Sequence, residues 1–154
     1  MPTSVCRVDG CLACDLAAGR LELPGGVIHE SPRFYVEHCV GPLGVGTLLV
    51  KPRRHVTRVG ELTEDEAAEL GRLLHRSAQV VDELVRPEQV YTCQWSHAGR
   101  TPGHIHWVVQ PATTADLDAL GTYGPGLQLA MFQRGDAPDP AAVEAFCDRA
   151  RGLF

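Results

Sequence analysis

The sequence predicts an α+β fold in which an antiparallel sheet packs against helices. Three segments rich in β-forming residues come first, at residues 27–30, 33–39 and 46–51, and proline or glycine bounds each of them. A long helical pattern follows, then two more strand patterns and a final helical pattern. Strands that precede one helix and follow it favour a meandering antiparallel sheet over repeated βα units.

The long helix is predicted over "LTEDEAAELGRLLHRSAQVVDELV", residues 62–85. Thr63 is the expected N-cap, and Glu66 stands at the position that completes a capping box. Arg86 and Pro87 are expected to end the helix, because the residue before a proline disfavours helical backbone. Apolar residues at helical spacing form one stripe, which consists of Leu70, Leu73, Leu74, Val81 and Leu84.

The remaining elements follow from the same rules. Strands are expected over "QVYTCQWSH" (89–97) and "HIHWVVQ" (104–110), with a Gly/Pro turn between them. A short helix is expected near residues 113–120 and a last one from Asp139 to about Gly152, with Pro140 in its first turn. We expect residues 1–154 to form one domain.

Composition and charge exclude several classes of function. The chain has 154 residues and a formal net charge of −5, which gives no electrostatic reason to bind nucleic acid or an anionic membrane. It lacks the run of about 18 apolar residues that a membrane span requires. The first residues, "MPTSVCRVDGCLACD", contain no apolar core of a secretory signal, so we expect a cytoplasmic protein.

The six cysteines are therefore expected to be reduced. Cys39, Cys93 and Cys147 lie singly in apolar segments and are predicted to pack as small core residues. Cys11 and Cys14 form a C-x-x-C pair, a spacing that redox sites and zinc sites share.

Two histidines, His104 and His106, lie two residues apart in the strand predicted over 104–110. Alternate residues of a strand share a face, so both imidazoles should point the same way and form a compact site. The same face is expected to carry His104, His106, Val108 and Gln110, and the core face Ile105, Trp107 and Val109. The preceding loop supplies donors suited to a phosphate, namely Ser96, Arg100 and Thr101.

The chain resembles the histidine triad (HIT) superfamily of nucleotide hydrolases and transferases. Three segments carry the resemblance in the family order: "CLACDLAAG", "GTLLVKPRRHV" and "AGRTPGHIHWVVQP". The resemblance covers about residues 11–111, and residues 112–154 form a C-terminal extension. It implies a HIT-like sheet with one long helix and a C-terminal helix, and a homodimer.

The chain also departs from the family pattern. Val108 replaces the third histidine of the triad, and Thr47 replaces the upstream histidine. Arg100 stands where the family has glutamine, and Gln94 where it usually has asparagine. His106, at the position of the family nucleophile, is retained.

The resemblance implies cleavage of a dinucleoside polyphosphate or nucleoside phosphoramidate at the α-phosphorus. His106 would be the nucleophile and would form a nucleotidyl-histidine intermediate. We expect Arg100 to supply a fixed positive charge that offsets the lost third histidine. The expected phosphate-binding residues are Arg100, Thr101, Ser96, His104 and Gln94. The expected nucleoside pocket includes Phe34 and His29.

In family members with an N-terminal C-x-x-C, a structural zinc ion is held by two cysteines and two histidines. The resemblance carries these ligands onto Cys11, Cys14, His55 and His104. Cys6 is a weaker candidate for one position. Two other functions stay open: a nucleotide sensor without turnover, which Val108 favours, and a hydrolase with a catalytic zinc. The second would need an open coordination position and a nearby carboxylate base.

Overall fold

The computed structural model describes residues 8–96 and 103–154. The strands are β1 (Val27–Glu30), β2 (Phe34–His38), β3 (Leu48–Pro52), β4 (Gln89–Cys93) and β5 (Trp107–Ala112). The α-helices are α1 (Leu12–Ala17), α2 (Glu64–Val85), α3 (Thr114–Leu120), α4 (Pro125–Arg134) and α5 (Pro140–Arg151). A single 3-10 turn, η1 (Val59–Glu61), precedes α2.

The five strands form one antiparallel sheet in the order β1-β2-β3-β5-β4. The predicted α+β fold with a meandering antiparallel sheet is therefore confirmed for β1 to β3 and for the β4–β5 pair. After α2, however, the chain returns to the edge of the sheet as β4 and then enters beside β3 as β5. The strand that follows the two histidines therefore lies inside the sheet.

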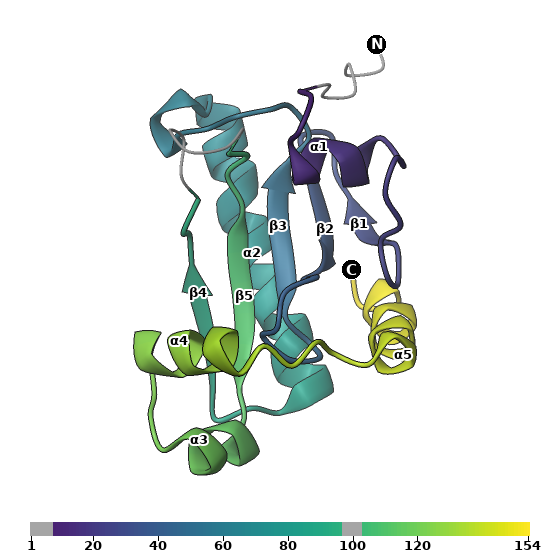
Figure 1. Ribbon diagram of the computed structural model, residues 1–154. Coiled ribbons are helices and arrows are strands. Elements are labelled where there is room, and N and C mark those ends of the chain that lie inside the picture. Colours follow the sequence, from purple (N-terminus) through teal and green to yellow (C-terminus); the bar gives the residue numbers. More distant parts are fainter. Residues whose placement is uncertain (1–7, 97–102) are drawn as a thin grey trace.

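Helices cover both faces of the sheet (Figure 1). On one face α2 and α5 pack against the strands, and the main core lies here with Val36, Val50 and Val109 fully buried. On the other face α4 covers β5 near Val108 through Leu127 and Met131. The helix α1 lies over the opposite end of this second face.

The helix α2 has the predicted boundaries. The Thr63 side chain accepts a hydrogen bond from the Glu66 amide, and the Glu66 carboxylate accepts one from the Thr63 amide, so the capping box is complete. Arg86 ends the helix in the left-handed conformation, with φ of 53°. The predicted stripe faces the core, where Leu70, Leu73 and Val81 are buried.

Gly46 shows why the turn into β3 requires glycine. Its φ is +95°, and a Cβ there would lie 2.6 Å from Cγ2 of Val85 on α2. Its amide donates a hydrogen bond to Nε2 of His38, whose Nδ1 donates to the Cys39 carbonyl. Both nitrogens of His38 thus serve the fold, and burial lowers the pKa of this imidazole.

Four elements differ from the expectations. The strand expected over residues 89–97 is β4, which ends at Cys93. The last strand begins at Trp107 rather than at residue 104, so the two histidines lie in the extended segment that leads into β5. The helix α1 begins directly after Cys11, where only a cysteine pair was recognised. The helix α4 was not expected, because its apolar residues follow a glycine-rich stretch and form no clear stripe.

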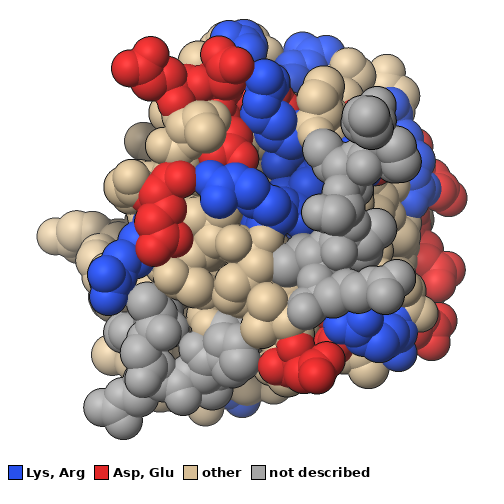
Figure 2. Space-filling view, turned by 90° about the horizontal axis from the view of Figure 1, so that it is seen from above, with Lys and Arg blue, Asp and Glu red and all other residues tan. Residues whose placement is uncertain are grey.

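The end of the molecule at which α2 begins carries basic and acidic side chains side by side (Figure 2). Arg54 donates two hydrogen bonds of 2.7 Å to the Glu66 carboxylate, and Arg33 bonds Glu69 at 2.8 Å. Within the described ranges, no helix has the length and apolar character needed to cross a membrane.

Candidate functional site

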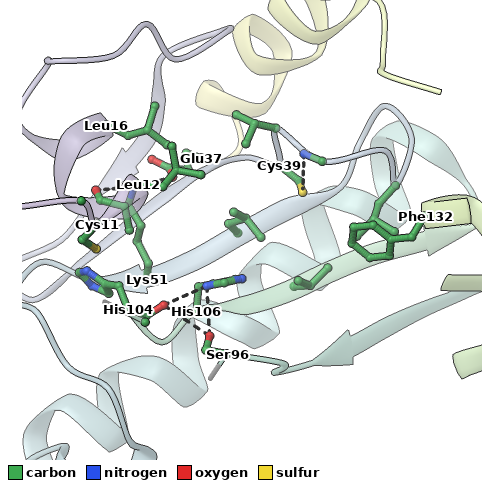
Figure 3. Close-up of a pocket in the computed structure, with 18 residues that line it drawn as sticks. Cys11, Leu12, Leu16, Glu37, Cys39, Lys51, Ser96, His104, His106 and Phe132 are labelled. Carbon is green, nitrogen blue, oxygen red and sulfur yellow. Dashed lines mark hydrogen bonds and ion pairs between the residues drawn. The ribbon is translucent and has the colours of Figure 1, made fainter. Parts of the chain in front are cut away.

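A pocket of about 590 Å³ opens on the face of the sheet that carries His104, His106 and Val108 (Figure 3). Its volume is within the range of small-molecule sites. One wall comes from α1 through Leu12 and Leu16, and α4 contributes Phe132 at the other end. The residues between them come from β2, β3 and the segment leading into β5, so the pocket joins elements distant in the sequence.

Beside the pocket the structure brings Cys11, Cys14, His55 and His104 together. One possible ligand atom from each of the four residues lies within 4.8 Å of the others. The Cys14 sulfur is 3.5 Å from Nδ1 of His55 and 3.7 Å from Nδ1 of His104. Both cysteines and His104 are buried, so the cluster is enclosed.

Local structure explains the convergence. Cys11 is the N-cap of α1 and Cys14 lies in its first turn, so both thiols emerge from one end of the helix. The amide of Ile105 donates a 2.8 Å hydrogen bond to the Val56 carbonyl, which places His55 beside His104. The two imidazole rings meet edge-on, with centroids 5.2 Å apart.

The hydrogen bonds of His104 prepare it as a metal ligand. Its Nε2 donates a 2.7 Å hydrogen bond to the carbonyl of Pro52, which leaves Nδ1 unprotonated and directed at the cysteines. Burial lowers the pKa of His104 to about 4, so the ring is neutral near pH 7. Because Nε2 is bonded to the Pro52 carbonyl and Nδ1 faces the Cys14 sulfur, neither nitrogen of His104 is free to bind a substrate phosphate.

The cluster fits zinc. Zn–S and Zn–N bonds of about 2.0–2.3 Å place tetrahedral ligand atoms roughly 3–4 Å apart, and the cysteine–histidine distances lie in this range. Two thiolates select against hard cations such as magnesium. Four protein ligands fill a tetrahedral shell, so the set suits a structural ion and not the open coordination that a hydrolase with a catalytic zinc would need.

His106 differs from His104 in its surroundings. Its Nδ1 donates a 3.0 Å hydrogen bond to the His104 carbonyl and lies 3.3 Å from the Ser96 hydroxyl. The protonated Nδ1 leaves a lone pair on Nε2. This nitrogen points away from both partners and into the pocket (Figure 3).

Val108 lies on the same face, further into the sheet. It is 6% exposed and packs in the apolar cluster of Leu43, Leu127 and Met131. Thr47 is fully buried, and its hydroxyl donates a 2.9 Å hydrogen bond to the Leu43 carbonyl. Val108 and Thr47, two of the positions at which the chain departs from the family pattern, are therefore packed into the fold, and neither offers a free donor to the pocket.

Of the other residues predicted to bind substrate, only some can be located relative to the pocket. Ser96 lines the pocket, whereas Gln94 follows β4 and is not among the described residues that line it. Arg100 and Thr101 lie outside the described residues, as do His97 and Cys6.

The nucleoside pocket expected at Phe34 and His29 is not where the structure places the cavity. Phe34 is fully buried in the core between the sheet and α2, on the opposite face from the pocket. His29 stacks on Phe154 with ring centroids 5.0 Å apart. Neighbouring strand residues point to opposite faces, so the pocket side of β2 carries Glu37 instead.

Sequence reasoning missed a charged pair in the pocket. Lys51 on β3 and Glu37 on β2 line the cavity and form a 2.5 Å ion pair. One signal was available, because Lys51 is the only lysine in the chain. It also missed a buried network that holds α4 to β5, in which Gln128 donates to the Gln110 side chain at 2.9 Å.

Known proteins are similar to this chain in sequence or in fold. No family model matches the chain. An uncharacterized HIT-like protein of Methanocaldococcus jannaschii is 22% identical over 111 residues, which are 71% of this chain and 84% of that protein.

Two solved structures have a similar fold. A hypothetical histidine triad nucleotide-binding protein from Sulfolobus tokodaii matches with a TM-score of 0.70 and 20% identity, over 93% of this chain and 91% of that one. A zinc-bound histidine triad family protein from Mycobacterium smegmatis matches with a TM-score of 0.66 and 19% identity, over the same shares of the two chains.

The fold and site thus define an antiparallel α+β protein with a pocket beside a Cys₂His₂ cluster. The chain is similar in sequence to a HIT-like protein, and it shares the fold of solved histidine triad structures.

Proposed function

We propose that this protein binds a nucleotide in the pocket and cleaves it at the α-phosphorus through His106. The observation that carries the proposal is the hydrogen bond from Nδ1 of His106 to the His104 carbonyl, which directs the Nε2 lone pair into the cavity. The Sulfolobus tokodaii protein with a similar fold is described as nucleotide-binding, which supports the ligand class.

In this mechanism Nε2 of His106 attacks phosphorus and the bond to the leaving group breaks. A covalent nucleotidyl-histidine forms, and water or another acceptor then displaces the histidine. Splitting the displacement into two steps lowers each barrier. The substrates that we propose are dinucleoside polyphosphates or nucleoside phosphoramidates.

The phosphoryl oxygens need donors that are held in place before the reaction. The Ser96 hydroxyl is near His106 and lines the pocket, which supports a role for it there. Arg100 and Thr101 remain proposed donors from their positions in the sequence. The Cys₂His₂ cluster would hold a structural zinc ion that fixes α1 and the His104 carbonyl, and hence the orientation of the His106 ring.

A second function, nucleotide binding without turnover, is favoured by Val108. A buried valine at the third triad position removes a donor to the phosphate and leaves an apolar wall. A sensor of this kind would keep the pocket and the zinc cluster but release no product.

On the family resemblance we also propose a cytoplasmic homodimer, which sedimentation analysis would test.

The deciding experiment is an assay of nucleoside monophosphate release. Purified protein is incubated with adenosine and guanosine phosphoramidates and with dinucleoside polyphosphates, and products are separated by chromatography. Release by the wild type but not by His106→Ala supports the nucleophile, with the exposed helix variant His75→Ala as control. Tight nucleotide binding without release would support the sensor instead.

A further inference from the structure

The pocket has a second polar wall that the proposed mechanism does not use. It consists of Lys51 and Glu37, whose side chains are 2% and 3% exposed and whose Nζ and Oε1 atoms are 2.5 Å apart. Removing two charges from water costs free energy that their mutual attraction often fails to recover. Stability alone is therefore a weak reason for this pair, and its place in the pocket suggests a role in binding.

The composition of the chain singles out the same residue. Of its 14 basic residues 13 are arginine, and Lys51 is the only lysine. An arginine presents a planar fork, whereas an ammonium presents three donors from one atom and can serve several partners at once. The one lysine of the chain thus lies in the wall of the cavity, where its compact ammonium can contact a ligand.

The pair retains hydrogen-bonding capacity. Two of the three ammonium donors of Lys51 are used, by Oε1 of Glu37 and by the Ala13 carbonyl at 3.4 Å. Among the described residues nothing donates to Oε2 of Glu37, and this oxygen is not one of the enclosed polar atoms without a partner. One donor and one acceptor therefore lie side by side in the pocket wall.

The two members of this wall lie at different distances from His106. Lys51 on β3 is beside the segment that leads into β5, and Glu37 on β2 is one strand further away. The strand register places Glu37 level with Leu49 and Val108, so Glu37 lies two strand spacings (about 10 Å) across the sheet from His106 and about two residues further along it. Figure 3 shows Glu37 beside Leu12 and Leu16, away from His106 and Ser96. The intervening surface is apolar, with Leu49 on the sheet and the two leucines on α1, which suits a flat ring.

We propose that Glu37 and Lys51 form a specificity element that binds the hydrogen-bonding edge of a guanine base. The inference rests on the proposed function, which places the phosphate at His106; a base that extends along the same pocket then lies against Glu37 and the Lys51 ammonium. The guanine N1–H and N2 amino group face the Glu37 carboxylate, and O6 accepts from Lys51. Adenine presents one amino group and a ring nitrogen in this region, so it makes fewer hydrogen bonds.

The test measures binding of GMP, IMP and AMP by calorimetry. The wild type binds GMP at least tenfold more tightly than AMP, with IMP between them because it lacks the N2 amino group. The double variant Glu37→Gln/Lys51→Met removes both charges together, so that no unpaired charge stays buried, and it loses the preference. Glu69→Gln neutralises another buried carboxylate, paired with Arg33 on the other face, and keeps the preference.

A second readout uses the single lysine. In protein labelled with ¹³C at the lysine ε-carbon, the side chain of Lys51 gives the only lysine signal. GMP shifts this signal and ribose 5-phosphate, which has no base, leaves it in place. A purely structural ion pair would respond to neither compound.

The outcomes separate this inference from the proposed function. Nucleotide cleavage that depends on His106 but shows less than a twofold base preference overturns the inference and leaves the function standing. A guanine preference that survives in the double variant also overturns it. Selective GMP binding through the pair without any cleavage supports the inference and refutes the hydrolase, whereas no nucleotide binding at all refutes both.

Discussion

His104 and His106 lie two residues apart on one face of one segment, yet they belong to two different regions. His104 is enclosed by protein. It is 5% exposed, its Nε2 donates to the Pro52 carbonyl, and its Nδ1 faces the two cysteines. Around His106 the site stays open, because Ser96 and a carbonyl hold Nδ1 while Nε2 faces a cavity. Residue type alone therefore does not assign a role; the partner of the second ring nitrogen does.

The two regions are also connected. The helix α1 carries both cysteines of the cluster and also supplies Leu12 and Leu16 to the pocket wall. The carbonyl that orients His106 belongs to His104 itself. A closed structural cluster at one end thus fixes the geometry of the open site, and variants that affect only one end show how far this connection extends.

The largest effect is expected from His106→Ala. If the imidazole is the nucleophile, its removal lowers kcat by about 10³-fold or more, since no other described group replaces the attacking nitrogen. Zinc content and melting temperature stay close to wild type, because the ring is not part of the cluster. Rapid-quench kinetics measures the loss of kcat and metal analysis measures the zinc content. A variant with unchanged turnover contradicts the assignment of His106 as the nucleophile.

Cys14→Ser is expected to disrupt the Cys₂His₂ cluster, which His106→Ala leaves intact. Losing one thiolate removes most of the zinc and lowers the free energy of unfolding by several kcal/mol, because a structural metal stabilises only the folded state. We expect a melting temperature at least 10 °C lower, and a similar shift when wild-type protein is treated with a chelator. Cys93→Ser lies outside the cluster and serves as the control. Full zinc content in Cys14→Ser would sink the ligand assignment.

Val108→His tests whether a histidine at the third triad position can take part in the reaction. The new imidazole would be enclosed with Leu127 and Met131 in an apolar cluster without a described partner, at a cost of about 1–3 kcal/mol. We expect denaturant unfolding to show this loss and turnover to stay at or below the wild-type value. Val108→Thr keeps the shape and separates polarity from size. A rise in turnover in Val108→His would mean that the position faces the phosphate after all.

Predictions from the sequence were most accurate for features that depend on neighbouring residues alone, such as the start of a helix and its buried face. The capping box from Thr63 to Glu66 fixed the start of α2, and the period of its leucines identified the buried face. The four cluster residues were predicted from the family resemblance, and the structure brings all four together. Their roles stay predictions, because spacing does not show which ion they bind.

The sequence failed where the answer depends on strand parity or register. Phe34 was assigned to the pocket, but a shift of one residue along β2 changes the face, and the pocket receives Glu37 instead. The Glu37–Lys51 pair forms only because β2 and β3 align Tyr35 with Lys51, which puts Glu37 diagonally beside it. Local patterns do not contain this register.

The smallest effect is expected at Glu66, far from both regions. Hydrogen bonds from Arg54 hold the pKa of Glu66 at about 2, although burial acts to raise it. Since the folded pKa is lower than the ordinary value of 4.5, the stabilisation is complete above pH 4.5 and is lost as pH falls toward 2. Glu66→Gln should cost about 1–2 kcal/mol at pH 7 through the weakened capping box and ion pair.

Chemical unfolding between pH 7 and pH 2.5 measures this contribution. The difference between wild type and Glu66→Gln should shrink steadily below pH 4.5, because the wild-type carboxylate loses its charge. Glu64→Gln, an exposed change in the same helical turn, should show a smaller effect at every pH. Zinc content and nucleotide release should not respond to either variant at pH 7. If they do, the α2 end is coupled to the site, and the division into a closed and an open region around two histidines is too simple.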